Sequence, residues 1–301
     1  MHASRTITKW QLRTRSLELG TRTLVMAVVN VTPDSFSDGG LFFDRDAAVA
    51  RCIECLEEGA DILDLGAEST RPGSRAGGED AAVSAEEEQA RLLPVVQGIF
   101  QERPHAVISV DTYKAATAKA ALDAGAEIVN DVSGFTWDAE MPQICANAGA
   151  GVVLMHTRGH PEEWQGQERL GPDAVLTVVR GGLAASLATA RRAGVPAEAI
   201  VLDPGYGFGK RHRENYALLA RQAELLALGR PLLAGVSRKS FLGHSLAELH
   251  GGEAAPVEAR ETASIAALTA AILHGASIVR VHAVRAAVEA ARIADAVLAA
   301  G

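Results

Sequence analysis

Short apolar runs recur along the chain, and longer amphipathic segments separate each run from the next. The runs are rich in Val, Ile and Leu, as strands buried on both faces are. The eight runs are 24–29, 62–65, 106–110, 128–129, 152–155, 200–202, 232–236 and 278–281. The segments between them place apolar residues three and four positions apart, which predicts helices. Seven such segments are 47–58, 85–100, 115–124, 175–193, 216–227, 259–274 and 284–299.

This regular alternation predicts an α/β fold, a (β/α)8 TIM barrel of parallel strands in a single domain. We expect residues 24–301 to form the barrel and residues 1–23 to form an N-terminal β-hairpin or cap. No Ser/Gly-rich linker and no run of charge divides the chain. An open doubly wound sheet is the alternative fold, but eight evenly used units favour closure.

The residue types at the ends of the runs indicate where the chemistry lies. In a parallel barrel the carboxyl ends of all strands meet at one mouth, where active sites form. Each run is followed by polar or ligand-capable groups, and an Asp or Asn at the end of a buried strand must find a partner. These groups are Asn30, Arg71, Asp111, Asn130, Met155 with His156, Asp203, Lys239 with Ser240, and Arg280 with His282.

The first of these loops, 30–40, has the sequence Asn-Val-Thr-Pro-Asp-Ser-Phe-Ser-Asp-Gly-Gly. No helix or strand favours this combination of Pro, hydroxyl residues, Asp and Gly. A buried strand that opens into an oxygen-rich loop is typical of the start of an active site in an α/β enzyme. The alternative is a plain surface turn.

One set of mouth residues suits an anionic group. Arg71, Arg280 and His282 are cationic or can become so, and Arg binds phosphate oxygens in a fork. The carboxamide of Asn30 is a neutral oxygen ligand, which together with water suits Mg²⁺. This set predicts a site for a diphosphate and a metal ion. For Arg71 and Arg280 the alternative is a surface ion pair. We interpret His156 as an ordinary hydrogen-bonded histidine.

A second set suits a flat heterocycle. Asp111 and Asp203 accept hydrogen bonds, Asn130 both donates and accepts, and Lys239 donates. Such a set can bind a ring that carries both N–H and C=O edges. Two further residues, Met155 and Phe208, are placed to flank that ring.

Charge and cysteine content exclude several classes of protein. The 301 residues carry a formal net charge of −8, which disfavours nucleic acid and anionic membrane surfaces as partners. The three cysteines favour a reducing compartment over a disulfide framework. Cys52 and Cys55 form a Cys-x-x-Cys, for which a redox or zinc site is the alternative to two helix positions. We find no signal segment and no apolar run of membrane length, so we expect a cytoplasmic protein.

The polar blocks taken together resemble the dihydropteroate synthase family of pterin-binding TIM barrels. The matching blocks occur in family order along nearly the whole chain. They are 30–40, 66–73 (Gly-Ala-Glu-Ser-Thr-Arg-Pro-Gly), 109–114 (Ser-Val-Asp-Thr-Tyr-Lys), 129–134, 154–156, 202–210, 237–241 and 280–282.

This resemblance implies a Mg²⁺-dependent transferase of folate biosynthesis that is usually a homodimer. Such an enzyme condenses 6-hydroxymethyl-7,8-dihydropterin diphosphate with p-aminobenzoate and releases pyrophosphate. Sulfonamides bind in the family where p-aminobenzoate does. Segments 34–38 and 74–78 have the composition of flexible loops, which fits lids that close when substrate is present.

The resemblance assigns a role to each matching position. Asp111, Asn130, Asp203 and Lys239 would hold the pterin, with Met155 and Phe208 beside it. Asn30, Arg280 and His282 would hold the diphosphate and its Mg²⁺, and Arg71 would close over them. Thr70, Pro72, Phe208, Lys239 and Ser240 would border the p-aminobenzoate pocket. Lys239, Asp111 and Arg71 are the catalytic candidates.

The chain departs from the family at one position of the mouth. The family usually has Asp after its last His, whereas this chain has Ala283 after His282, so a carboxylate that would orient His282 is absent there. One rival is a pterin-binding barrel of the corrinoid methyltransferase kind, which would have no use for 237–240 or for the loop at 30–40. The other is a non-catalytic paralogue that binds pterin or serves as a scaffold.

Overall fold

Eight parallel strands close into a barrel, which confirms the fold predicted from the alternation of strand and helix. The computed structural model describes residues 5–31, 45–69, 76 and 83–300. Around the ring the strands follow the order β10-β3-β4-β5-β6-β7-β8-β9. Their bounds are β3 Leu24–Asn30, β4 Ile62–Gly66, β5 Ile108–Asp111, β6 Ile128–Asp131, β7 Gly151–Met155, β8 Ile200–Asp203, β9 Leu232–Ala234 and β10 Ala276–Val281.

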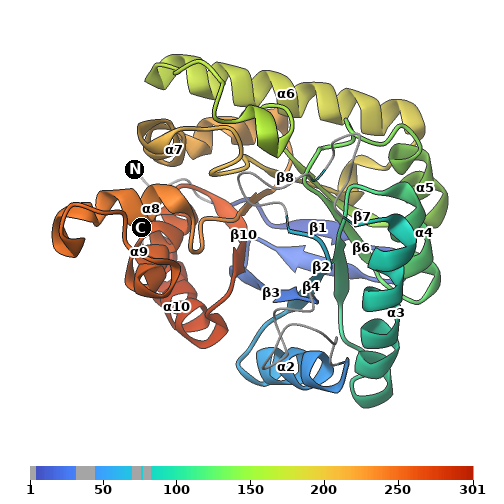
Figure 1. The fold of residues 1–301 in the computed structure, drawn as a ribbon. Coiled ribbons are helices and arrows are strands. Elements are labelled where there is room, and N and C mark those ends of the chain that lie inside the picture. The colour runs from blue at the N-terminus through green and yellow to red at the C-terminus, as the bar shows by residue number, and fades with distance from the viewer. Residues whose placement is uncertain (1–4, 32–44, 70–75, 77–82, 301) are drawn as a thin grey trace.

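Helices surround the barrel and cover the outer face of its strands (Figure 1). The α-helices are α2 Arg45–Glu57, α3 Ala85–Glu102, α4 Ala115–Asp123, α5 Met141–Ala148, α6 Pro172–Ala193, α7 His212–Ala220, α8 Ser240–Ser245, α9 Glu261–Leu273 and α10 Val284–Ala300. Short 3-10 helices are η1 Pro161–Glu163, η2 Ala197–Ala199, η3 Gln222–Leu228, η4 Ala247–His250 and η5 Val257–Arg260.

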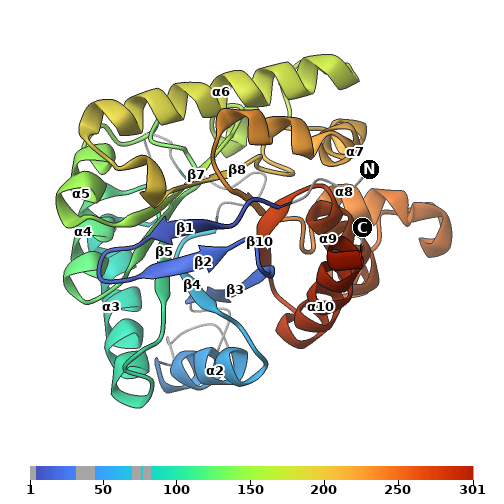
Figure 2. The ribbon, with the colours of Figure 1, turned by 180° about the vertical axis from the view of Figure 1, so that it is seen from behind.

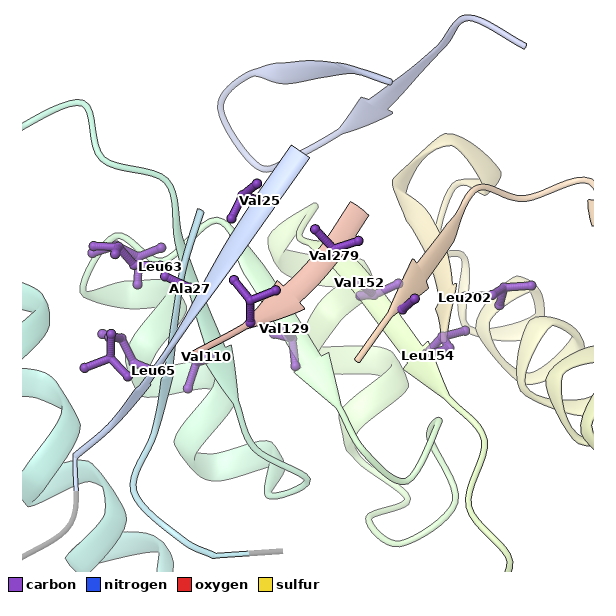
Figure 3. Packing of buried hydrophobic residues seen from close by; sticks show 14 of the residues in the cluster. Val25, Ala27, Leu63, Leu65, Val110, Val129, Val152, Leu154, Leu202 and Val279 are labelled. Carbon is purple, nitrogen blue, oxygen red and sulfur yellow. The ribbon is translucent and has the colours of Figure 1, made fainter. Parts of the chain in front are cut away.

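Two apolar layers hold the barrel together because successive side chains of a strand point to opposite faces. The outer layer lies between strands and helices and includes Val25 and Ala27 of β3 and Leu63 and Leu65 of β4 (Figure 3). The alternate residues of the same strands, such as Met26, belong to a separate inner cluster. The strands read as continuous apolar runs because both of their faces are buried.

The N-terminal hairpin closes the end of the barrel where the strands begin. β1 Thr8–Gln11 and β2 Ser16–Leu19 pair antiparallel and lie across the barrel in the rear view (Figure 2). Trp10 packs with first residues of the strands, such as Leu24, and its indole N–H donates to the carbonyl of Ala199 at 2.8 Å. The opposite end, where the strands finish, is therefore the end left for a site.

The prediction of one continuous helix at 216–227 is wrong. The chain forms α7 and then η3, with a break at Arg221. Gln222 is fully buried, and its side chain accepts from the Tyr206 hydroxyl at 2.7 Å and donates to the carbonyl of Ala271 at 3.0 Å. These tertiary hydrogen bonds replace the regular helix, an effect that apolar spacing does not reveal.

Helix α6 departs from our expectation that nothing in the chain reaches membrane length. Among the described residues it is the one helix that is long and apolar enough to cross a membrane by length and composition. It buries Val175, Leu176, Val179, Leu183 and Ala190 in this fold. Its apolar residues are thus used in packing on the barrel.

Cys52 and Cys55 lie in α2 and Cys145 in α5, all three with buried free thiols. Burial raises the pKa of Cys52 to about 12 and that of Cys55 to about 11, so both thiols stay protonated and unreactive. The reading of the Cys-x-x-Cys as two helix positions is confirmed.

Candidate active site

The guanidinium of Arg280 joins three strands at the mouth of the barrel. It extends from β10, and its Nε donates to Oδ2 of Asp64 on β4 at 2.6 Å. Its Nη2 donates to Oδ2 of Asp111 on β5 at 2.5 Å. Asp64 is fully buried, and the side chains of Arg280 and Asp111 keep 19% and 13% of their exposure. A substrate that enters the mouth can therefore reach Arg280 and Asp111, whereas Asp64 lies beneath them.

Asp64 is the principal residue that sequence reasoning missed. It occupies the middle of β4, and the Nδ2 of Asn130 also donates to its Oδ2, at 3.1 Å. Its Oδ1 is buried and has no hydrogen-bond partner among the described residues. The signal was a charged residue inside an otherwise apolar run, two positions before the strand end and therefore facing the same way as that end.

Asp203 ends β8 and lies close to Arg280. Its Oδ1 accepts a hydrogen bond of 2.7 Å from the backbone N–H of Gly205. A Cβ on Gly235 would lie 3.6 Å from Oδ2 of Asp203 and 4.0 Å from Cβ of Arg280. The missing side chain at Gly235 keeps the space between these two charged groups open.

Lys239 directly precedes α8, and its side chain reaches back over the loop that follows β8. Its Nζ lies 4.0 Å from the centre of the Phe208 ring. A Cβ on Gly207 would lie 3.2 Å from its Cδ, so the aliphatic part of Lys239 passes closely over a glycine. Ser240, the first residue of α8, is exposed beside it. Lys239 and Ser240 thus border the mouth from the β9 side.

Met155 and Phe208 belong to one apolar cluster at the mouth. Its other buried members are Ala76, Tyr113, Val132 and Trp164, and Trp137 packs against it. Trp164 meets Phe208 edge to face, with ring centroids 5.1 Å apart. Sequence reasoning assigned nothing to Trp164, because its loop has no periodic pattern and the contact depends on the fold.

Burial and charge shift the acid–base properties of these groups. Burial raises the pKa of Asp111 to about 7, although the charge of Arg280 opposes the shift. Burial lowers the pKa of Lys239 to about 8, and the like charge of Arg280 adds to the effect. Burial also raises the pKa of Asp203, against the hydrogen bond from Gly205. A carboxyl and an amine that titrate near neutrality in one cleft are typical of a functional site.

His282 follows β10, and its side chain contacts the hydroxyl of Ser237. The family usually has an Asp carboxylate next to this His, where this chain has Ala283. The Oγ of Ser237 lies 3.0 Å from Nδ1 of His282 and 3.4 Å from its backbone nitrogen, which donates to it. When the hydroxyl donates to Nδ1, the ring proton resides on Nε2, which then acts as a hydrogen-bond donor. Ser237 thereby orients His282.

The His156 backbone pairs with that of Asp203, but its side chain lies against Gly182 of α6, and the residue is 7% exposed. Burial lowers its pKa well below the ordinary value, and Lys210 and Arg158 add to the shift. Its Nδ1 has no hydrogen-bond partner among the described residues, so the expectation of a fully hydrogen-bonded histidine is wrong for this atom.

Asn30 ends β3 with an exposed carboxamide on the same rim. Within the described part of the chain, no group of three or more His, Cys, Asp or Glu residues could hold a metal ion. One neutral oxygen does not form a dedicated metal cage. It does fit Mg²⁺, which keeps several waters and binds through substrate phosphates and one or two protein oxygens.

Three predicted residues lie outside the described part of the chain: Thr70, Arg71 and Pro72. The same holds for most of the loop at 30–40 and for nearly all of 74–78, so the predicted lids stay predictions. The structure joins Asp111 to Arg280 directly and Asn130 to Arg280 through Asp64. Asp203 lies beside Gly235 and close to Arg280, and Met155 and Lys239 are grouped with Phe208. It places His282 directly after β10 and Asn30 at the end of the neighbouring strand β3.

Comparison with known proteins agrees with this geometry. The family model described as "Pterin binding enzyme" matches residues 26–282. A dihydropteroate synthase of Mycobacterium leprae is 43% identical over 277 residues, which is 92% of this chain and 94% of the relative.

Solved structures agree as well. The Yersinia pestis dihydropteroate synthase, solved with a sulfonamide drug complex, has a TM-score of 0.85 and 36% identity over 98% of this chain and all of its own. The Xanthomonas albilineans enzyme in complex with 7,8-dihydropteroate has a TM-score of 0.80 and 37% identity over 97% of this chain and 99% of its own. The chain belongs to the pterin-binding enzymes and, among them, to the dihydropteroate synthases, which are transferases.

Proposed function

We propose that this protein condenses 6-hydroxymethyl-7,8-dihydropterin diphosphate with p-aminobenzoate to give 7,8-dihydropteroate and pyrophosphate. The observation that carries the proposal is the arrangement of Asp111, Asn130 and Asp203 at the ends of three strands, with Lys239 above the mouth and Arg280 among them. The relative solved with 7,8-dihydropteroate supports the product.

The acid–amide groups suit the pterin ring. The ring offers N–H donors to the carboxylates of Asp111 and Asp203, while its carbonyl and ring nitrogens accept from Asn130 and Lys239. The apolar cluster around Met155 and Phe208 supplies a wall for the ring face. Asp64 acts from below, because it accepts from both Asn130 and Arg280 and so fixes their orientation.

The chemical step needs no nucleophilic side chain, because the substrate amine attacks directly; the protein has to stabilise the leaving group. The amine nitrogen of p-aminobenzoate bonds to the exocyclic methylene carbon of the pterin as the carbon–oxygen bond to the diphosphate breaks. The electron pair of that bond leaves with pyrophosphate, and the amine releases one proton. Arg280 would stabilise the departing negative charge and His282 would donate a hydrogen bond to it, because fixed charges and dipoles act strongly in a site that excludes water.

Mg²⁺ is part of this proposal and would be held by Asn30 and by diphosphate oxygens. When bound, it would supply positive charge for the leaving pyrophosphate. We also place Arg71 over the diphosphate, and Thr70, Pro72 and Ser240 around p-aminobenzoate. The sulfonamide complex of the Yersinia relative supports the proposal that the same pocket accepts sulfonamides here.

Cytoplasmic location and a homodimer complete the proposal. Free, buried thiols at Cys52, Cys55 and Cys145 suit a reducing compartment. Light scattering of the purified protein would measure its mass, and a value near a single chain of 31.5 kDa would contradict the dimer.

A turnover assay tests the proposed function. Purified protein, pterin diphosphate, labelled p-aminobenzoate and Mg²⁺ should yield dihydropteroate and pyrophosphate in equal amounts. Pterin binding without product would favour the non-catalytic paralogue, and no binding at all would contradict the proposal.

A further inference from the structure

Lys210 is a buried lysine for which the proposed chemistry has no task. It stands at the end of the loop that follows β8 and is 6% exposed. Its Nζ donates to the carbonyls of Gly205 at 2.7 Å, His156 at 3.0 Å and Phe208 at 3.1 Å. An ammonium group has three N–H bonds, and here each of them has a carbonyl partner.

The shape of the loop explains why those carbonyls need a donor. Gly205, Gly207 and Gly209 have φ values of +69°, +83° and +68°, a conformation that residues with a Cβ rarely adopt. The loop therefore turns back on itself and directs the carbonyls of Gly205 and Phe208 inward. Buried carbonyls without a donor are rare because water no longer reaches them.

Two of the residues held by Lys210 also hold Asp203. The N–H of Gly205 donates to Oδ1 of Asp203 at 2.7 Å, and the N–H of His156 donates to the Asp203 carbonyl at 3.0 Å. Lys210 binds the carbonyl of each of these same two residues. Its position therefore fixes both the side chain and the backbone of Asp203.

The third carbonyl connects Lys210 to the apolar side of the mouth. It belongs to Phe208, whose ring lies 4.0 Å from the Lys239 ammonium and meets the ring of Trp164 edge to face. A shift of the Phe208 backbone would therefore move the ring that Lys239 and Trp164 contact.

Asn215 completes the support of this loop from α7. It is fully buried, its Oδ1 accepts from the N–H of Gly207 at 2.7 Å, and its Nδ2 donates to the carbonyl of Lys210 at 3.0 Å. Lys210 and Asn215 together pair the peptide groups of the loop at residues 205, 207, 208 and 210. Burial lowers the pKa of Lys210, whereas the nearby Asp203 favours the ammonium form.

We propose that Lys210 is a positioning residue for pterin binding, which sets Asp203 and Phe208 through three backbone carbonyls without touching the substrate. This inference rests on the proposed function, because it concerns the pterin part of that site. It does not extend to the diphosphate part, since Arg280 lies on β10 and forms its hydrogen bonds with Asp64 of β4 and Asp111 of β5, away from the loop at 204–210.

The test compares two ligands in one variant. Lys210→Met should weaken binding of 6-hydroxymethyl-7,8-dihydropterin, which lacks the diphosphate, by roughly tenfold or more, which corresponds to about 1.4 kcal/mol. Its affinity for pyrophosphate should change by less than about twofold, a difference below 0.5 kcal/mol in order of magnitude. Calorimetry at a temperature well below unfolding measures both dissociation constants.

Two controls separate positioning from general stability. Asp295→Asn weakens the partly buried contacts of Asp295 with Arg5 and Thr23 at the far end of the barrel, so it should lower Tm and leave both affinities unchanged. Lys119→Met removes an exposed lysine and should change neither Tm nor the two affinities. An equal loss of affinity for both ligands in Lys210→Met, or an unchanged affinity for the pterin, would overturn the inference. Failure of the wild-type protein to bind pterin would instead contradict the proposed function.

A measurement on the wild-type protein keeps the inference testable if Lys210→Met does not fold. The chain has lysines only at 9, 114, 119, 210 and 239, so ¹⁵N-labelled lysine side chains give few signals. Substituting the other four in turn assigns Lys210 by elimination. Its ammonium protons should exchange with water far more slowly than those of exposed Lys119. Equally rapid exchange would overturn the inference.

Discussion

The Nη2 of Arg280 donates to Oδ2 of Asp111 at 2.5 Å and so connects β10 with β5 across the mouth of the barrel. In the ring of strands, β3 and β4 separate these two. The contact links the cationic set of residues to the acid–amide set, which the sequence suggested as separate groups. Arg280 therefore affects the carboxylates of the proposed ring site in addition to any diphosphate.

Loss of this guanidinium should change both stability and pH dependence. Arg280→Ala leaves Asp64 and Asp111 without their cation, so we expect the free energy of unfolding to fall by about 3–5 kcal/mol. Because the charge of Arg280 holds the pKa of Asp111 down, the acid limit of pterin binding should move to higher pH in this variant. Chemical denaturation and pterin titrations at several pH values measure the two effects.

Arg22→Ala provides the matched control for Arg280→Ala. Arg22 pairs with Asp61 but is 57% exposed, so its removal should cost about 1 kcal/mol or less and leave the pH dependence unchanged. An Arg280→Ala protein with wild-type stability and an unshifted acid limit would contradict the role that we assign to the contact.

Lys239 is the residue whose removal should most directly stop turnover. Lys239→Ala loses the amine beside Phe208 and the proposed ring site, and we expect kcat to fall by roughly 100-fold or more while the fold survives. Lys119→Ala is the control, since Lys119 is exposed on α4. Circular dichroism checks the fold, and product formation measures the rate. Wild-type rates in Lys239→Ala would exclude a catalytic role.

The shifted groups predict a bell-shaped pH profile of kcat/KM. Below about pH 7 Asp111 takes up a proton and no longer accepts a hydrogen bond from the ring as a carboxylate. Above about pH 8 Lys239 loses a proton, and with it the positive charge at the mouth. Activity should therefore be highest between these limits, which belong to the site as a whole because the two groups interact. A profile that is flat through this range would show that neither ionisation matters.

Metal removal tests the role of Asn30. EDTA should abolish product formation, and added Mg²⁺ should restore it, whereas Asn30→Ala should require a higher Mg²⁺ concentration for half-maximal rate. Binding of a pterin that lacks the diphosphate should be unaffected by EDTA. Full activity in the chelator would remove the metal from the proposed mechanism.

The barrel was predictable because strands buried on both faces give continuous apolar runs, and helices buried on one face give apolar residues three and four positions apart. These patterns depend on local spacing, so all eight runs became strands even where short, as at Ile128–Asp131. The strand-end residues were also predictable, because a parallel barrel places all carboxyl ends at one mouth.

The pairing of those residues was not predictable, because it depends on which strands are neighbours and how far each side chain reaches. Asp64 lies inside a strand run and has its partners on β6 and β10, at sequence distances of 66 and 216 residues. Trp164 reaches Phe208 from a loop with no periodic pattern. The break between α7 and η3 likewise follows from the buried hydrogen bonds of Gln222.

The account depends above all on Asp203, a carboxylate on β8, acting as a pterin ligand at the mouth where β5 and β10 also end. The most direct measurement is the dissociation constant of 6-hydroxymethyl-7,8-dihydropterin for wild-type protein and for Asp203→Asn. We predict at least a roughly tenfold loss in Asp203→Asn, about 1.4 kcal/mol or more, with no comparable loss in the Asp295→Asn control. Equal affinity of the wild-type and Asp203→Asn proteins would contradict the account.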